Sequence, residues 1–128
     1  MGFPTVASSA LSSRGTNAVD DVITMPAGIV AGDLLIVIHA TDVGPTRTWS
    51  GGFIEIKDLS ASSNVGVAYK IAAGGDTLTV TKSVTERFSA IALRITNWHG
   101  TTAPEISATV TGSSTLPNPD SLTASWGV

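Results

Sequence analysis

Glycine and proline interrupt this chain at short intervals, and that spacing limits the fold more than any other feature of the sequence. The interruptions are MPAGIVAGD, VGPT, SGG, AAGGD, NWHGTTAP and TGSSTLPNP, and they separate segments of five to nine residues. Segments of that length suit the strands of a sandwich or barrel better than helices. A chain of 128 residues can bury a real core as one domain.

Between the interruptions, apolar residues alternate with small or polar ones. In VGVAYKI the valines, the tyrosine and the last isoleucine fall on one side, whereas Gly66, Ala68 and Lys70 fall on the other. TLTVT and EISATV show the same period of two. Each pattern predicts a strand with one wet face, so we expect an all-β, antiparallel β-sandwich.

The stretch AGDLLIVIHA differs, because Leu34 to Ile38 are all aliphatic. A continuous apolar run predicts a strand that is covered on both faces, either in the centre of the module or under an interface with another subunit. The preceding Gly32-Asp33 pair predicts a turn into that strand, since glycine adopts positive φ freely and aspartate bonds nearby backbone N–H groups. GGDTLTV repeats the same device at Gly75-Asp76.

One segment, SVTERFSAIALRI, fits two structures. Ser83 and Glu86 could form a capping box, and apolar residues recur at helical spacing from Val84. The alternation that ends at Leu93 and Ile95, together with the β-branched content, favours a strand instead.

The composition argues against several classes of function. Charged residues are 13% of the chain, the net charge is −3, and the seven lysines and arginines are scattered, whereas nucleic-acid binding needs clustered cations. No apolar run reaches the ~20 residues of a membrane helix. Cysteine is absent, and 15 serines and 17 threonines predict a polar, weakly charged surface.

Residues that could perform chemistry are few and poorly grouped. His39 and His99 are not spaced as metal ligands, so we interpret them as structural histidines. Asp20 and Asp21 are adjacent, which in a strand points them to opposite faces, although in a loop they could hold calcium with backbone carbonyls. We expect no catalytic residue, no metal site and no cofactor.

Three tryptophans, Trp49, Trp98 and Trp126, stand at or near the ends of expected strands. They could close the ends of the core, or they could form aromatic platforms for a glycan. The candidate ligand loops are therefore those of Trp49 and of Trp98 with His99.

The order MPAGIVAGDLLIVIHA, WSGGFIEI, VGVAYKIAAGGDTLTVT, ERFSAIALRITNWHG and PNPDSLTASWG resembles a module of tailed-bacteriophage structural proteins. The resemblance runs from about Met25 to Gly127, and its motifs are architectural, not catalytic. It implies a jelly-roll-like β-sandwich in which SVTERFSAIALRI is a strand. It also implies a virion protein, made in the host cytoplasm, that contacts the major capsid protein or other virion proteins.

Two ends of the chain are candidates for these contacts. We predict a flexible N-terminal arm over residues 1–16, followed by the sandwich domain over 17–128. Ser12, Ser13 and Arg14 of the arm could become ordered on a neighbouring subunit. At the other end, Leu122, Ala124 and Trp126 alternate as a last strand, which is either incomplete or an edge that pairs with a partner.

The leading hypothesis is a non-enzymatic capsid decoration or cement protein that forms a homo-oligomer, such as a trimer. The alternative is a tail-fibre or receptor-binding module that recognises host-surface glycans. Neither hypothesis involves nucleic acid or a membrane.

Overall fold

The computed structural model describes residues 3–60, 64–107 and 122–123, and within them all regular structure is β-strand. Every pair of neighbouring strands is antiparallel. The all-β, antiparallel prediction is therefore confirmed. The strands are β1 (Thr5–Ile23), β2 (Leu34–Thr41), β3 (Arg47–Trp49), β4 (Ile54–Leu59), β5 (Asn64–Ile71) and β6 (Leu78–Thr96).

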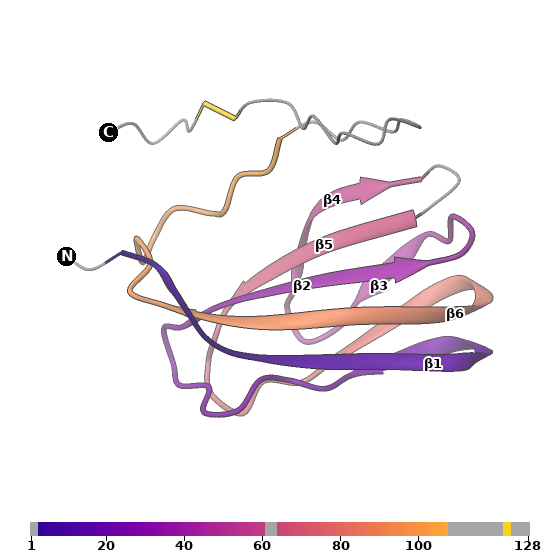
Figure 1. Ribbon diagram of the computed structural model, residues 1–128, viewed down its shortest axis with the longest axis horizontal. Coiled ribbons are helices and arrows are strands. Elements are labelled where there is room, and N and C mark those ends of the chain that lie inside the picture. Colours follow the sequence, from indigo (N-terminus) through magenta and orange to yellow (C-terminus); the bar gives the residue numbers. More distant parts are fainter. Residues whose placement is uncertain (1–2, 61–63, 108–121, 124–128) are drawn as a thin grey trace, which may run out of the picture.

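The sheet bends back on itself because β1 and β6, of 19 residues each, run through both of its halves (Figure 1). The first part of β1, together with residues 88–96 of β6, joins β2, β5 and β4 in the order β1-β6-β2-β5-β4; we call this the large layer. The second part of β1, with residues 78–86 of β6, joins β3; we call this the small layer. The register of β1 against β6 shifts between Arg14 and Ala18, where the strands turn from one layer to the other.

The hydrophobic core lies between the two layers. Ile23, Leu78 and Val80 of the small layer belong to one buried cluster with Leu35 and Val37 of the large layer. Leu35, Val37 and Val80 have no exposed surface at all. The β-sandwich and its jelly-roll likeness are finer statements than the single six-stranded sheet carries, and they stay predictions.

The turn predicted before β2 is confirmed. Gly32 has a φ of 92°, which glycine tolerates and other residues rarely adopt. The Asp33 carboxylate accepts a hydrogen bond from the Val30 N–H at 2.9 Å and one from Arg94 Nε at 2.6 Å. The same device recurs at Asp76, which accepts from the backbone N–H groups of Ala73 and Gly74.

The predicted flexible arm is wrong for most of its length. Residues 5–16 are not an arm but the first part of β1, and they pair with β6 from Thr5↔Thr96 to Arg14↔Phe88. The alternation that marks a strand is hidden there by Ser, Gly and Thr, which are also the residues of linkers. In contrast, the strand interpretation of SVTERFSAIALRI is confirmed, because that whole segment lies in β6.

Two further predictions can be compared with the structure. Within this chain Ile38 of β2 is 37% exposed while its neighbours Val37 and His39 are buried, so cover of the second face of β2 by another subunit stays a prediction. In β5 the alternation is right but the wet face is wrong: Gly66 and Ala68 are buried, whereas the opposite row contains the half-buried Val65 and Tyr69, the exposed Ile71 and the buried Val67. The reason is that Gly66 packs beneath Arg47 and Trp49 of β3, where a Cβ atom would lie 2.7 Å from Arg47 Cδ.

Candidate functional site

The most unusual group of side chains is an ionic network that is buried between the two layers. It centres on Asp21 of β1, His39 of β2 and Lys82 of β6, whose side chains have no exposed surface. Asp21 Oδ2 lies 2.5 Å from Lys82 Nζ. The same oxygen is hydrogen-bonded to His39 Nε2 at 2.9 Å. Arg14 binds the other carboxylate oxygen, Oδ1.

The strand pattern explains why three polar groups meet in a core. Lys82 follows Leu78 and Val80 on the inward face of β6, and His39 follows Leu35 and Val37 on the inward face of β2. Residues two apart in a strand share a face, so each polar side chain extends a row of apolar ones. Asp21 and Lys82 come from the small layer and His39 from the large one, so the network joins the layers.

Arg47 of β3 makes a second bridge between the layers. Its Nε donates to His39 Nδ1 at 3.2 Å, while its terminal nitrogens donate to Asp58 Oδ1 at 2.7 Å and Thr41 Oγ1 at 3.1 Å. Because Nδ1 of His39 accepts this bond, the proton of the neutral ring is on Nε2, and His39 donates it to Asp21. Burial is the main cause that lowers the pKa of His39 below 6.5, and the nearby Arg47 cation adds to it; the hydrogen bond to Asp21 opposes the shift.

Phe88 closes the network on one side. Its ring stacks on His39 with the ring centroids 5.4 Å apart, and the Lys82 ammonium lies 5.6 Å from the Phe88 centroid. Arg14 approaches the same ring at 5.3 Å. These cation–π contacts partly replace the hydration that the cations lose on burial.

The network has no access from solvent at its centre, so its chemistry is confined to the groups already in it.

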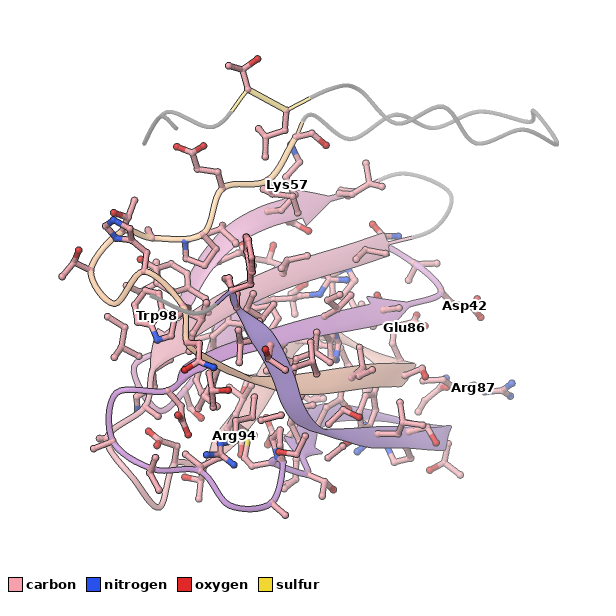
Figure 2. All side chains as sticks on the ribbon, turned by 60° about the vertical axis from the view of Figure 1, so that its left-hand side comes forward. Asp42, Lys57, Glu86, Arg87, Arg94 and Trp98 are labelled. Atoms are coloured by element: carbon pink, nitrogen blue, oxygen red, sulfur yellow. The ribbon has the colours of Figure 1, made fainter. Side chains whose placement is uncertain are left out.

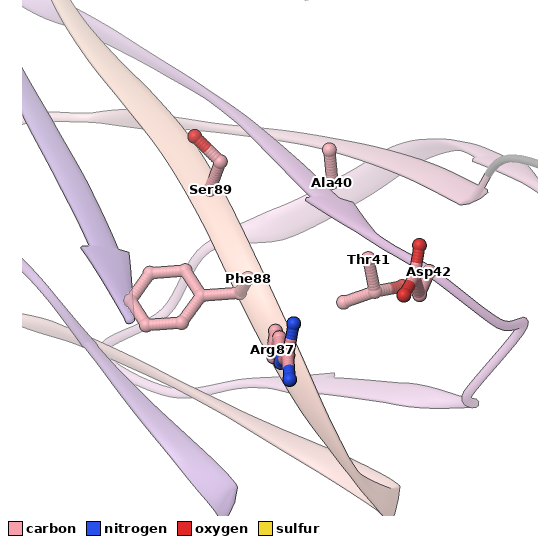
Figure 3. A pocket seen from close by; sticks show the side chains of 6 residues that line it. All are labelled: Ala40, Thr41, Asp42, Arg87, Phe88 and Ser89. Carbon is pink, nitrogen blue, oxygen red and sulfur yellow. The ribbon is translucent and has the colours of Figure 1, made fainter. Parts of the chain in front are cut away.

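The neighbouring surface hollow, of about 360 Å³, is lined by Thr41, Asp42, Arg87 and Phe88, together with Ala40 and Ser89 (Figure 3). Asp42 and Arg87 are charged and surface-facing at this end of the molecule, and Trp98 lies at the opposite end (Figure 2). Buried ion pairs of this kind fix the arrangement of a core more than they add to stability.

A second hollow, of about 260 Å³, brings together two of the predicted ligand residues. Trp98 and His99 line it with Leu34, Ile95 and Leu122, and with Pro4, Thr102, Pro104 and Glu105. The Trp98 indole N–H donates to the Gly32 carbonyl at 2.8 Å, which fixes the ring beside the turn that precedes β2. This hollow is mainly apolar, with an imidazole and a carboxylate at its rim.

Trp49, the third predicted ligand residue, lies elsewhere. It packs against the core cluster, its ring is edge-on to His39, and its N–H donates to Glu55 Oε2 at 2.6 Å. Of the two interpretations that the sequence left open, core closure describes Trp49.

The outer face of the large layer, on the side away from the core, carries apolar side chains from every strand of that layer. The pairing places Ile38 between Val67 and Ile91, and Leu11 opposite Ile91. We call this surface the outer face; its most exposed residues are Val6, Leu11, Ile38, Ile54 and Ile71. Leu11, at 76% exposure, borders a shallow hollow of about 290 Å³ over Ile38 and Ile91.

The predicted contact residues fall in two places. Ser12, Ser13 and Arg14 lie in β1, where Ser12 Oγ accepts the Thr24 N–H and Arg14 binds Asp21. Leu122 borders the hollow of Trp98, whereas Ala124 and Trp126 lie outside the described residues. Asp20 and Asp21 are in a strand and point apart: Asp20 accepts from Thr81 Oγ1 at the surface, and Asp21 is buried.

Within residues 3–60, 64–107 and 122–123 no three acidic, histidine or cysteine side chains are arranged to hold a metal ion. The same part of the chain contains no helix that is long and apolar enough to cross a membrane. No protein-family description, no curated protein and no solved structure matches this chain.

Sequence reasoning missed the network, although a signal for it was present. Lys82 and His39 stand at positions whose neighbours two residues away are core aliphatics, and a charged group there needs a buried partner. Asp21 stands likewise two residues before the buried Ile23. The identity of the partners could not be read, because Asp21 and Lys82 are 61 residues apart and meet only through the β1–β6 register.

Proposed function

We propose that this chain is a non-enzymatic structural protein of a phage virion, most specifically a capsid decoration or cement protein. Its partner is the major capsid protein or another virion protein, and the outer face of the large layer is the surface that binds it. The assembled protein belongs to the virion and is made in the host cytoplasm. The resemblance to tailed-phage modules supplies the setting of this proposal.

The observation that carries the proposal is the apolar outer face. Monomeric proteins seldom expose contiguous apolar patches that extend over several strands, and such patches mark surfaces that another polypeptide covers. Leu11 and Ile38 border one shallow hollow with Ile91, and the other residues that line this hollow are uncharged: Ala40, Ser89 and Ala90. An interface of this composition suits permanent assembly.

The ionic network supports the same function in a different way. Asp21, His39 and Lys82 are sealed from solvent, so a substrate cannot contact them, and together with Arg47 they join the layer that carries the outer face to the layer behind it. A binding surface that is held rigid loses less entropy when it docks.

A homo-oligomer, such as a trimer, would present several copies of this face. Charge is not the means of attraction here, because the outer face carries few charged residues and the chain as a whole has a net charge of only −3. We therefore expect binding that is insensitive to salt.

The test is binding of the purified protein to phage particles that lack it, measured by co-sedimentation. Leu11→Glu combined with Ile38→Glu places two carboxylates on the outer face, and we expect it to lower the bound fraction at least about tenfold. Val22→Glu is the matched control, because Val22 is 72% exposed on the small layer, and it should bind like the unchanged protein. Equal binding by the double variant, with an unchanged melting temperature, would refute the proposal.

A second candidate function is glycan recognition by a tail-fibre or receptor-binding module. The hollow of Trp98 and His99 favours it, because an aromatic wall with polar groups at its rim suits a sugar ring. Trp98→Ala should abolish binding on a glycan array. Loss of the same signal in Trp49→Ala, whose ring lies in the core, would point to misfolding instead of a binding site.

A further inference from the structure

We propose that Lys82 and Asp21 form an intramolecular isopeptide bond, so that β6 and β1 are joined covalently inside the core. The inference does not depend on the proposed virion function. It rests on the ion pair, its burial and the proton-carrying group beside it.

The two reacting groups are already held together and have no contact with bulk solvent. Lys82 Nζ and Asp21 Oδ2 are 2.5 Å apart, and neither side chain has exposed surface. They project from neighbouring strands, where Asp21 pairs with Val80 and Lys82 is two residues further along the same face. Fixing an amine against a carboxyl group in this way replaces a bimolecular step with an intramolecular one, which can be worth effective molarities of about 10⁵ M or more.

The condensation balances within the pair itself. The Lys82 ammonium carries three protons; Nζ keeps one as the amide N–H, and two leave with Asp21 Oδ2 as one water molecule. Nζ forms its bond to Asp21 Cγ as the Cγ–Oδ2 bond breaks. The ammonium and carboxylate charges disappear together, and no oxidant, nucleotide or other reactant is needed.

Each neighbouring group has a place in that step. His39 Nε2 is 2.9 Å from the oxygen that leaves and donates a hydrogen bond to it, so the ring holds that oxygen while two protons of the Lys82 ammonium pass to it. Arg47 fixes the tautomer that places the His39 proton on Nε2. Arg14 binds Oδ1, the oxygen that stays, and can stabilise the negative charge that develops there during attack.

Burial also supplies the driving force. A buried ion pair carries the free-energy cost of taking two charges out of water. The amide that replaces it is uncharged and does not carry that cost. The product water leaves a site that solvent does not enter, so hydrolysis of the new bond is slow. The Lys82 amide N–H retains an acceptor, since Nζ already donates to the Glu86 carbonyl at 2.9 Å.

Intact mass spectrometry of the denatured full chain tests the bond directly. We expect the mass to be lower than that of the sequence by one water molecule. After trypsin, the acylated Lys82 should resist cleavage, and a branched peptide should join residues 15–47 to residues 71–87.

Two variants make the result specific. Lys82→Arg keeps the positive charge but cannot condense, so it should show the full mass and no branched peptide. Asp20→Asn changes the neighbouring surface carboxylate and should remain linked. An unreduced mass in the unchanged protein overturns the proposal, and so does a lost water without the branched peptide, because a cyclic imide within one chain segment would explain it.

Discussion

Replacing Gly66 by alanine tests whether the interior is as tightly fixed around Arg47 as the structure indicates. An added Cβ would lie 2.7 Å from Arg47 Cδ and 3.0 Å from both Arg47 Nε and Trp49 Cζ2. Cβ atoms in proteins do not approach other atoms this closely, so Arg47 or Trp49 must move. Neither can move freely, because Arg47 bonds to three side chains and Trp49 packs in the core.

The cost follows from these contacts. Overpacking a core costs about 1–3 kcal/mol, and loss of a charged hydrogen bond of Arg47 adds roughly 1.5–3 kcal/mol. We therefore expect Gly66→Ala to lower the free energy of unfolding by roughly 2.5–6 kcal/mol. In a chain of this length, 3 kcal/mol corresponds to a fall in melting temperature of about 10 °C.

Urea unfolding followed by circular dichroism measures this loss, and Gly15→Ala is the matched control. Nothing lies within 4 Å of a Cβ atom at Gly15, so that variant should be neutral or slightly stabilising. In the background of Arg47→Met, Gly66→Ala should cost less, because the flexible methionine can move aside. A Gly66→Ala variant as stable as Gly15→Ala would refute the packing described around Arg47.

Three further predictions concern the charged groups. The pKa of His39 is lowered on folding, so as the pH falls the unfolded chain binds a proton before the folded chain does. The stability should therefore fall as the pH drops below 6.5. His39→Gln should remove this pH dependence, as measured by thermal melts across the pH range. Asp21→Ala should cost about 3–5 kcal/mol in urea unfolding, because Lys82 then stays a buried ammonium with neither a counter-charge nor the proposed amide bond to neutralise it, and a cost near zero would mean that the network is not needed. The Val30 N–H and the Arg94 guanidinium lower the pKa of Asp33, so its contribution is present above pH 3.8 and lost below; Asp33→Asn should flatten the acid limb of the stability curve there and leave the His39 range unchanged.

The strands could be predicted from alternating apolar residues in β5 and β6, and the turn at Asp33 followed from glycine and aspartate chemistry. The same alternation misled in EISATV, because its described residues 105–107 lie in no strand. The first part of β1 could not, because serine and threonine fit a linker as well as a strand. Its partner residues 88–96 make it a strand, and they lie far away in the sequence. Tertiary pairing, not local preference, decided that segment.

The facing of β5 and the ionic network were missed for the same reason. Alternation gives two faces but does not say which one is buried, and in β5 the small residues face inward because Arg47 and Trp49 occupy the space above Gly66. His39 is buried and hydrogen-bonded, yet its partners Asp21 and Arg47 depend on how the two layers meet. Such contacts follow from three-dimensional register, which the sequence pattern does not contain.

The most direct test of the proposed function is the number of copies of this chain in purified phage particles, measured by quantitative mass spectrometry against the major capsid protein. A decoration protein should be present at a copy number comparable with that of the capsid protein. A count of only a few oligomers would contradict capsid decoration and favour the tail or fibre alternative. Absence from the particle would contradict the virion proposal altogether.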